Sequence, residues 1–407
     1  MIESRALVCQ LGARGHYLTA RCLARQGLLA CLATDFWSPI YLGKSAILRR
    51  LPRAALGALG RNHPDLRGER IAAFPSLGIA RYMLALFDKQ CRQGKRDDFI
   101  AKLFARCVRS LDIRHDVFWG YSYDSLELLQ HERESGVFTI LCQTDPGPAH
   151  YRMIREEDGR WPEYTVVKAR PWEQQRAERL RQEWALAKVI VVNSTWTRDA
   201  IVAEGAEAAK IEIIPLAFEA KAETLKPETL KPSGKLRVLW LGNLTLGKGI
   251  QYLVEAARLL VHEPVEFLVG GTSYISHAAM QSAPRNLRWL GQIPRSAVTD
   301  LYQDCDVFVF PTLSDGFGMT QLEAMAHGVP VIATPNCGQV VEDGKTGFVI
   351  PPRDPNALAE AILKFASNRH LSLQMAPACR QTVKAHSFAA HGQRLLEIIE
   401  NHKNPLR

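Results

Sequence analysis

The stretch SDGFGMTQLEAMAHGVPVIATP, residues 314–335, contains two carboxylates whose spacing suits the binding of a polar ligand. Asp315 and Glu323 have seven residues between them, and Gly316 and Gly318 follow the first acid within three positions. Two acids on either side of a glycine turn can accept hydrogen bonds from hydroxyl groups at both ends of one elongated ligand.

The glycine turn is predicted to lie between a strand and a helix. VFVFP (307–311) is typical of a buried strand, and a helix is expected from about Met319 to His327, with Gly328 as its cap. Ligands bind beyond the carboxyl ends of parallel strands, and a helix N-terminus there presents unpaired N–H groups that hold phosphate. The backbone amides expected to approach a phosphate are those of Phe317, Gly318, Met319 and Thr320.

The two acids then have different partners. Glu323 stands one helical turn past Met319, where it can accept hydrogen bonds from the vicinal hydroxyls of a ribose. Asp315 suits sugar hydroxyls, because a carboxylate and a phosphate repel each other. Either acid alone is more often an ordinary surface residue, but strand end, glycines, helix start and acids together predict a nucleotide-sugar site.

A second strand, glycine turn and helix occur in LWLGNLTLGKGIQYLVEAARLL, residues 239–260. Lys248 immediately precedes the helix, where its ammonium group can neutralise a diphosphate that leaves as a glycosidic bond breaks. A lone lysine is often only a surface residue, and the position at the start of the same sheet is what favours a functional role.

Short apolar runs separated by helix-like stretches predict the elements that carry these residues. Such a rhythm indicates βαβ units and a parallel sheet buried on both faces, and it restarts after residue 235, so we expect an α/β chain with two parallel sheets. The predicted strands cover 6–12, 28–34, 116–121, 138–144 and 188–194, then 236–242, 265–271, 287–291, 307–311, 329–334 and 347–352.

The predicted domains follow from this rhythm and from a polar interruption. ETLKPETLKPSGK (223–235) contains a tandem copy punctuated by proline and is interpreted as a linker or extended loop. We expect a first domain over 1–218, a linker over 219–235, a second domain over 236–385 and a C-terminal helix over 386–407 that crosses back to the first domain.

Composition is that of an ordinary globular protein, with 47% hydrophobic and 23% charged residues among 407. No apolar run approaches the roughly 20 residues of a membrane span, and the N-terminus reads as a strand, so we expect a cytoplasmic protein. Nine scattered cysteines without a CxxC pair make a disulfide framework or zinc site improbable. No paired-Asp motif or His/Cys cluster predicts a metal site.

The net charge of +9 is unevenly distributed. Residues 1–120 carry 20 Lys and Arg against 9 Asp and Glu, so the positive net charge of this region exceeds that of the whole chain. This region is either an ordinary solvated surface or attracts anionic lipid or an anionic acceptor, and no module indicates nucleic acid. The basic stretches 45–61 and 81–110 have helical spacing that suits either a membrane surface or packing on the sheet.

The second half of the chain resembles glycosyltransferase family 4, whose members are retaining enzymes with the GT-B fold, two Rossmann-like domains facing a central cleft. The first half is similar mainly over residues 183–219. The second half is similar in LGNLTLGKGIQYLVEA (241–256), FLVGG (267–271), LGQIPRSAVTDLYQDCDVFVFPTLSDGFGMTQLEAMAHGVPVIAT (290–334) and EDGKTGFVIPPRDPNALAEAI (342–362).

The resemblance implies roles for particular residues. Glu323 matches the acid that binds ribose, and Asp315, one methylene shorter than the family's glutamate, matches the acid that holds the donor sugar. Lys248 matches the lysine at the leaving diphosphate, and Asn243 stands where the family often has arginine. The donor site is expected to include Gly242, Asn243, Lys248, Gly270, Gly271, Ile293, Asp315, Phe317, Gly318, Met319, Thr320 and Glu323.

The acceptor side is expected at two loops of the first half. In CQTDPGPAH (142–150), Thr144 stands where many members have histidine, and Asp145 matches the following aspartate. GARGHY (12–17) follows the first strand, and such a loop in relatives lies near the diphosphate and acceptor, which implicates Gly15 and His16. His16 can equally be a packed loop residue. The catalytic residues implied are Lys248, Asp315 and Asp145.

These observations predict a metal-independent, retaining glycosyltransferase that moves a hexose from a nucleotide-diphosphate sugar to an acceptor hydroxyl on a glycan, lipid or small molecule. The nucleotide sugar is a co-substrate, and no cofactor is expected. Peripheral contact with an anionic membrane through the basic first half remains an alternative to a purely cytoplasmic enzyme. The rival interpretations are a sugar-nucleotide epimerase and a nucleotide-sugar-binding protein without turnover.

Overall fold

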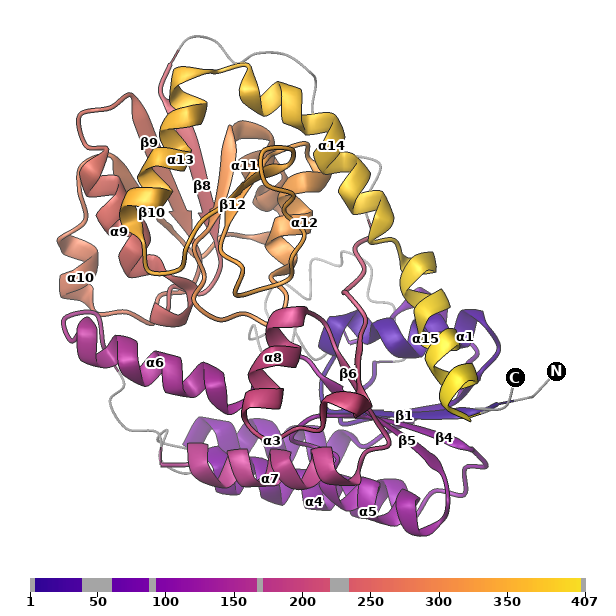
Figure 1. Cartoon of the computed structure of the whole chain (residues 1–407). Helices are drawn as coiled ribbons and strands as arrows, with labels where there is room; N and C mark the ends of the chain where they lie inside the picture. The colour runs from indigo at the N-terminus through magenta and orange to yellow at the C-terminus, as the bar shows by residue number, and fades with distance from the viewer. Residues whose placement is uncertain (1–3, 39–60, 88–92, 167–170, 220–233, 404–407) are drawn as a thin grey trace, which may run out of the picture.

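The computed structural model has two lobes, each built around a parallel sheet, with the lobes stacked one above the other (Figure 1). The structure describes residues 4–38, 61–87, 93–166, 171–219 and 234–403. The sheet of the first lobe has the order β3-β2-β1-β4-β5-β6-β7, and that of the second has the order β10-β9-β8-β11-β12-β13. The predicted α/β class with two parallel sheets is confirmed.

The strands coincide with the predicted apolar runs, except that β3 and β7 were not predicted. Both are three-residue edge strands with half-buried side chains, too short to show a periodicity. The first sheet comprises β1 (Ala6–Gln10), β2 (Leu29–Thr34), β3 (Ile71–Ala73), β4 (Val117–Tyr121), β5 (Phe138–Gln143), β6 (Val189–Val192) and β7 (Ile211–Ile213). The second comprises β8 (Leu236–Leu241), β9 (Val265–Gly270), β10 (Leu287–Gly291), β11 (Val307–Phe310), β12 (Val331–Ala333) and β13 (Gly347–Val349).

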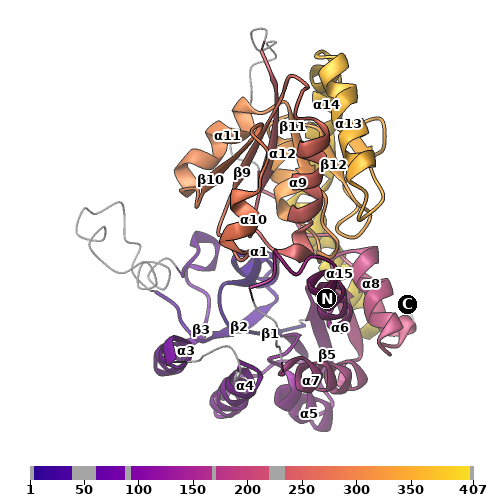
Figure 2. The same cartoon turned by 90° about the vertical axis from the view of Figure 1, so that its left-hand side faces the viewer.

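Helices cover both faces of each sheet (Figures 1 and 2). In the first lobe they are α1 (Leu18–Arg25), α3 (Pro75–Phe87), α4 (Gln93–Arg109), α5 (Leu126–Glu134), α6 (Pro148–Arg160), α7 (Glu173–Leu186) and α8 (Thr195–Ala203). After β8 they are α9 (Ile250–Leu259), α10 (His277–Gln281), α11 (Val298–Asp304), α12 (Met319–Ala326), α13 (Pro355–Ser367), α14 (Leu371–Ala385) and α15 (Phe388–Lys403).

Alternation along β1 shows how the first sheet is buried on both sides. Leu7 and Cys9 pack with α4, α5 and α7 on one face, whereas Ala6 and Val8 pack with α1 and α15 on the other. Successive strand residues point to opposite faces, and both faces here are apolar, which explains the near-continuous hydrophobic runs in the sequence. The residues that directly follow the carboxyl ends of β5 and β6, Thr144 and Asn193, lie next to Gly316 of the other lobe.

The last helix, α15, lies beside α1 of the first lobe rather than on the second sheet (Figure 1). Leu395 is fully buried in the first lobe's core, and Phe388 is covered by the guanidinium groups of Arg21 and Arg25 at 4.6 and 4.1 Å from its ring centroid. The chain thus crosses between the lobes a second time. The exact domain boundaries stay a prediction.

Helix α6 provides another connection between the lobes. Its Glu157 is fully buried and accepts hydrogen bonds from Gln251 Nε2 at 2.9 Å and Tyr252 OH at 2.8 Å, both on α9. Arg353 Nε also donates to Glu157, at 2.7 Å. Beyond the helix, Tyr164 is part of the second lobe's apolar core. One buried carboxylate therefore ties a first-lobe helix to two segments of the second lobe.

Some of the predicted features lie wholly or partly outside the residues that the structure describes. Residues 45–60 of the predicted stretch 45–61 and most of the predicted linker 219–235 lie outside the described residues, as does a short part of 81–110. The remainder of 81–110 is helical, in α3 and α4. The eight cysteines in the described ranges are free thiols. Among the helices described, none is both long and apolar enough to span a bilayer.

Gly249 offers a test of how tightly the strand ends are packed. Its φ is +72°, and a Cβ there would lie 1.8 Å from the Pro311 carbonyl oxygen, whereas Gly344 has φ +73° and no atom within 4 Å of such a Cβ. We expect Gly344→Ala to lower the thermal midpoint by roughly 2–6 °C through backbone strain alone. Gly249→Ala should lower it by at least twice as much, measured by calorimetry. Equal shifts would contradict the close packing at Gly249.

Candidate active site

Helix α12 begins where the sequence predicted, directly after the glycine turn that follows β11. Gly318 precedes the helix with φ +80°, and a Cβ there would lie 2.4 Å from Phe310 Cε1, so the turn requires glycine. The Phe317 amide donates to Asp315 Oδ1 at 3.2 Å. The free N–H groups at the start of α12 give this end of the helix a partial positive charge.

Lys248 and Asp315 form an ion pair at this strand edge. Lys248 ends the short helical turn Leu246–Lys248, and its Nζ contacts Asp315 Oδ2, while also lying 5.8 Å from the ring centroid of Phe310. The two side chains are 27% and 19% exposed, so water screens the pair only in part. The two catalytic residues expected from the second half are thus in direct contact.

Glu323 contacts a buried tyrosine, unlike Asp315, which pairs with a lysine. Its Oε2 accepts a hydrogen bond from the buried Tyr302 hydroxyl at 3.0 Å, and the Tyr302 ring stacks on His327 at a centroid distance of 5.4 Å. The half-buried side chain of Glu323 stands one turn along α12, as predicted, but it does not contribute to the lining of the cavity described next.

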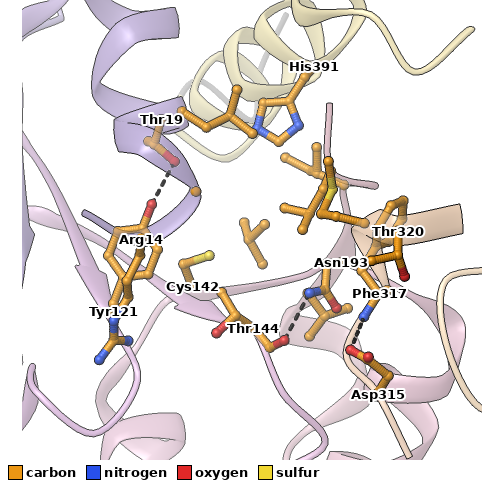
Figure 3. Close-up of a pocket in the computed structure, with 18 of the residues that line it drawn as sticks. Arg14, Thr19, Tyr121, Cys142, Thr144, Asn193, Asp315, Phe317, Thr320 and His391 are labelled. Atoms are coloured by element: carbon orange, nitrogen blue, oxygen red, sulfur yellow. Dashed lines mark hydrogen bonds between the residues drawn. The ribbon is translucent and has the colours of Figure 1, made fainter. Parts of the chain in front are cut away.

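A cavity of about 460 Å³ lies between the lobes and receives residues from both. Figure 3 shows Thr19 and Tyr121 of the first lobe on one side of it and Asp315, Phe317 and Thr320 of the second lobe on the other. Of the predicted site residues, those that line the cavity are Gly15, Thr144, Gly242, Lys248, Asp315, Phe317, Gly318, Met319 and Thr320.

The other predicted residues lie around the cavity without lining it. Asp145 Oδ1 accepts hydrogen bonds from Tyr123 OH at 2.8 Å and from the Gly147 amide at 2.8 Å. The carboxylate therefore stabilises the turn in which it lies. His16 Nε2 lies 3.2 Å from Arg295 Nη2 of the second lobe. Asn243 is exposed.

The predicted glycines after β9 serve close packing of the strand ends. A Cβ on Gly270 would lie 2.8 Å from Ile293 Cγ1, and one on Gly271 would lie 1.6 Å from the Gly242 carbonyl oxygen. Ile293 and these glycines therefore bring the ends of β8, β9 and β10 together below the cavity. They shape the floor next to Gly242, which does line it.

The glycine turn of the second lobe also touches the first lobe. A Cβ on Gly316 would lie 1.9 Å from the Thr144 carbonyl oxygen, and Ser194 Oγ donates to the Gly316 carbonyl at 2.6 Å. Asn193 Nδ2 donates to the Thr144 carbonyl at 2.9 Å. The sequence analysis missed Asn193 and Ser194, although their place directly after β6, before a helix that Ser194 caps, marks the same sheet edge.

His150 is a third residue near the cavity that was not predicted from the sequence. Burial lowers its pKa most, Asp145 opposes this, and Lys248 lowers the pKa further, so the imidazole is neutral near pH 7. Its Nδ1 has no hydrogen-bond partner in the described structure. The family resemblance placed a histidine at position 144, where this chain has threonine. The histidine of this chain stands six residues later, in the first turn of α6, which begins at Pro148.

The comparisons with known proteins agree with this geometry. Residues 235–368 match the sequence model of the family described as Glycosyl transferases group 1. The chain is 28% identical over 242 residues to a D-inositol 3-phosphate glycosyltransferase of Corynebacterium urealyticum, covering 53% of this chain and 57% of that protein. It is 32% identical over 116 residues to sucrose-phosphate synthase 4 of Arabidopsis thaliana, covering 27% of this chain and 11% of that protein. The chain thus spans little more than half of the first relative and a small part of the second.

Solved structures resemble the whole chain. A sucrose-phosphate synthase from Thermosynechococcus elongatus superposes with a TM-score of 0.68 at 17% identity, covering 98% of both chains. HepE from Anabaena, solved in complex with UDP and glucose, superposes with a TM-score of 0.61 at 14% identity, covering 98% of this chain and all of that one. Together with the two parallel sheets, these matches establish the predicted GT-B fold.

The neutral state of His150 gives a prediction for acid pH. Because its folded pKa lies below that of the unfolded chain, the unfolded state binds more protons once the pH falls below about 6.5. The stability that the protein gains by burying a neutral His150 is therefore fully present above that pH and is lost as the pH falls below it. We expect the thermal midpoint of His150→Gln to fall less than that of the wild type when the pH is lowered from 7.5 to 5.

The matched control is the exposed His277, replaced as His277→Gln. Thermal unfolding of wild type and both variants should be recorded at half-unit steps of pH. The control should follow the wild-type profile. A His150→Gln profile as steep as that of wild type would show that the imidazole is not held neutral by its surroundings.

Proposed function

We propose that this chain is a retaining glycosyltransferase of family 4 that transfers a hexose from a nucleoside-diphosphate sugar to an acceptor hydroxyl. The contact between Lys248 and Asp315 at the start of α12 carries the proposal, because it puts a cation, free amides and a carboxylate on one edge of the cavity. We assign donor binding to the second lobe, over 236–385, and acceptor binding to the first, over 1–218.

In the proposed reaction, the acceptor oxygen forms a bond to the anomeric carbon while the bond from that carbon to the diphosphate oxygen breaks. The diphosphate departs with the bonding electrons and takes up the acceptor's proton. Attack on the face from which the diphosphate leaves retains the configuration. Lys248 and the amides of residues 317–320 stabilise the negative charge that develops on the leaving group, so the reaction requires no metal.

Asp315 has two partners in this scheme. It pairs with Lys248 when the donor is absent, and it accepts hydrogen bonds from the donor's hexose when the diphosphate engages the lysine. Glu323 would bind the ribose from its position one turn into α12, which requires the ribose to reach past the cavity's edge toward Tyr302. Asp145 would act indirectly, by fixing the turn that carries Thr144 to the cavity wall.

The relatives support a nucleotide sugar as donor. The superposed HepE structures were solved in complex with UDP, with UDP-glucose, and with UDP and glucose. A second superposed structure is described as a lipopolysaccharide outer core galactosyltransferase. We therefore propose a uridine-diphosphate hexose as the first donor to test.

The direct experiment is to incubate the purified protein with UDP-glucose, UDP-galactose and their GDP and ADP counterparts, and to measure nucleotide release with and without alcohols. Release that an acceptor accelerates, with a new glycoside in the product, supports transfer. Conversion of one nucleotide sugar to another without an acceptor would instead identify an epimerase. Tight binding of the nucleotide sugar without any release would identify a binding protein.

Lys248→Ala tests the role of the leaving-group cation. Losing one preorganised electrostatic donor costs about 10²-fold or more in turnover, so we expect a fall of that size with a smaller change in the Michaelis constant for the donor. Lys345→Ala, at an exposed lysine of the same lobe, is the control and should retain wild-type rates. Unchanged turnover in Lys248→Ala would remove the basis of the proposed mechanism.

We further propose that the enzyme is cytoplasmic and touches anionic membranes through α3. Four neighbouring apolar side chains on this helix are exposed: Ile79 by 59%, Tyr82 by 45%, Met83 by 44% and Leu84 by 40%. Helix α4 packs beside α3 and carries exposed basic residues at Lys102, Arg106 and Arg109. Apolar side chains beside basic ones suit the surface of an anionic bilayer.

Vesicle cosedimentation tests this contact. We expect the protein to pellet with vesicles of phosphatidylglycerol and phosphatidylcholine but not with phosphatidylcholine alone, and Met83→Asp to reduce the bound fraction severalfold. Val202→Asp, at an exposed valine of α8, is the matched control. Binding that is indifferent to lipid charge and to Met83→Asp would refute the contact.

A further inference from the structure

Most of the side chains that the first lobe and α15 contribute to the cavity are apolar. Its side chains come from α1, from three strands of the first sheet, from the segment after β7 and from the returning helix α15. Apart from the partly buried Cys142 and Leu216, each is less than 9% exposed, so they enclose the cavity rather than form an open surface. These residues, the apolar wall, are Leu18, Trp119, Cys142, Val191, Ile214, Leu216 and Leu395.

Polar side chains on the same wall satisfy one another. The hydroxyls of Thr19 and Tyr121 are 3.1 Å apart and hydrogen-bonded, and Asn193 Nδ2 donates to the Thr144 carbonyl, as the dashed lines in Figure 3 show. Hydroxyls and amides that are already paired with each other have less capacity to hold the many hydroxyls of a sugar.

The one cation of this wall is also engaged. Arg14 pairs with Asp124 through Nη2 and donates from Nη1 to the Ser122 carbonyl at 3.2 Å. Among the described residues that line the cavity, the only other charged side chains are Lys248 and Asp315, which belong to the donor side and pair with each other. A phosphorylated acceptor would therefore bring an anion to a wall without a free cation.

His391 is the exception on this wall. It enters the cavity from α15, at the end opposite Asp315 (Figure 3). Its Nδ1 donates a hydrogen bond to the Pro215 carbonyl at 2.9 Å, which leaves Nε2 as an acceptor. Burial lowers the pKa of His391, so the imidazole is neutral at physiological pH.

We propose that the acceptor is an uncharged alcohol with an apolar carbon skeleton, bound along the apolar wall, and that His391 Nε2 accepts a hydrogen bond from a second donor group at its far end. This inference rests on the proposed function and deepens it. A polyol or a sugar phosphate would leave buried hydroxyls or a buried charge unpaired, whereas an alkyl or aromatic body gains from leaving water. The reacting hydroxyl lies at the other end, toward Asp315 and the donor.

The acceptor's skeleton is tested with the wild-type enzyme and the donor found above. The series is 1-propanol, 1-pentanol and 1-octanol, with benzyl alcohol as an aromatic skeleton and glycerol and glycerol 3-phosphate as polar acceptors. Burying a methylene favours binding by up to about fourfold, so kcat/KM should rise two- to fourfold per added methylene until the wall is filled. Preference for octanol over benzyl alcohol indicates a lipid chain as the natural skeleton, and the reverse preference indicates a compact aromatic one.

Three results would overturn the inference: a kcat/KM independent of chain length, a preference for glycerol or glycerol 3-phosphate, and donor hydrolysis without transfer to any alcohol. Donor hydrolysis and UDP binding by calorimetry report separately on the proposed function. An enzyme that fails with the alcohols but binds the nucleoside diphosphate of its donor and hydrolyses that donor has a different acceptor from the one proposed, whereas one that neither binds nor hydrolyses any of the donors tested is not a glycosyltransferase.

Leu216→Asn tests the wall itself, because Leu216 is only partly buried and the change keeps the size of the side chain. We expect kcat/KM for 1-octanol to fall at least tenfold, with UDP affinity and donor hydrolysis unchanged. Leu259→Asn, at a leucine of α9 that is 54% exposed, makes the same chemical change outside the cavity and should have no effect. Equal behaviour of the two variants would refute the apolar wall as the acceptor site.

His391 is tested with a pair of acceptors that differ in one hydroxyl. We expect 1,8-octanediol to be preferred over 1-octanol by about fivefold, the worth of one hydrogen bond. His391→Asn keeps a donor near the position of Nδ1 for Pro215 but removes Nε2, and it should abolish this preference while leaving transfer to 1-octanol intact. His391→Gln, whose amide can reach the position of Nε2, should restore part of it. A preference that is absent in wild type or survives in His391→Asn would refute the anchor.

Discussion

The structure depends on holding one ammonium group, that of Lys248, at the carboxyl edge of a parallel sheet beside the start of a helix. A half-buried cation costs free energy unless a partner offsets the loss of water, and Asp315 supplies that partner. Each residue is fixed by a glycine that cannot be replaced without a clash, Gly249 after the lysine and Gly316 after the aspartate. The position of the positive charge therefore depends on the backbone conformation at these glycines as well as on the lysine side chain.

The same constraint explains how the lobes meet. Gly316 comes so close to Thr144 that the turn carrying Asp315 is also a contact surface of the first lobe, and Ser194 binds its carbonyl. On the other side, Glu157 ties α6 to α9 and Arg353. The two contacts hold the lobes together at different places, one at the cavity and one at α6. The turn that carries Asp315 thus belongs both to the edge of the cavity and to the contact between the lobes.

Sequence reasoning succeeded where a local rule decides the outcome. The start of α12 at Met319 follows from Gly318, and the position of Lys248 and Asp315 at one sheet edge follows from two strand ends, although their ion pair was not predicted. It missed β3 and β7, whose pairing is decided by neighbours rather than by their own three residues. It also missed His150, because nothing local shows that a first-turn histidine of one lobe is buried against a lysine of the other.

His391 illustrates the same limit at the scale of the whole chain. The amphipathic pattern of the last segment predicts a helix but does not say which sheet that helix will cover. Because α15 returns to the first lobe, it closes the cavity with Leu395 and brings in a neutral imidazole. The polarity of the first lobe's side of the cavity is therefore set by residues some 370 positions apart, Leu18 and His391 among them. The second lobe's edge of the cavity can be inferred from one contiguous motif, whereas a wall assembled from such distant segments can be inferred only from the fold.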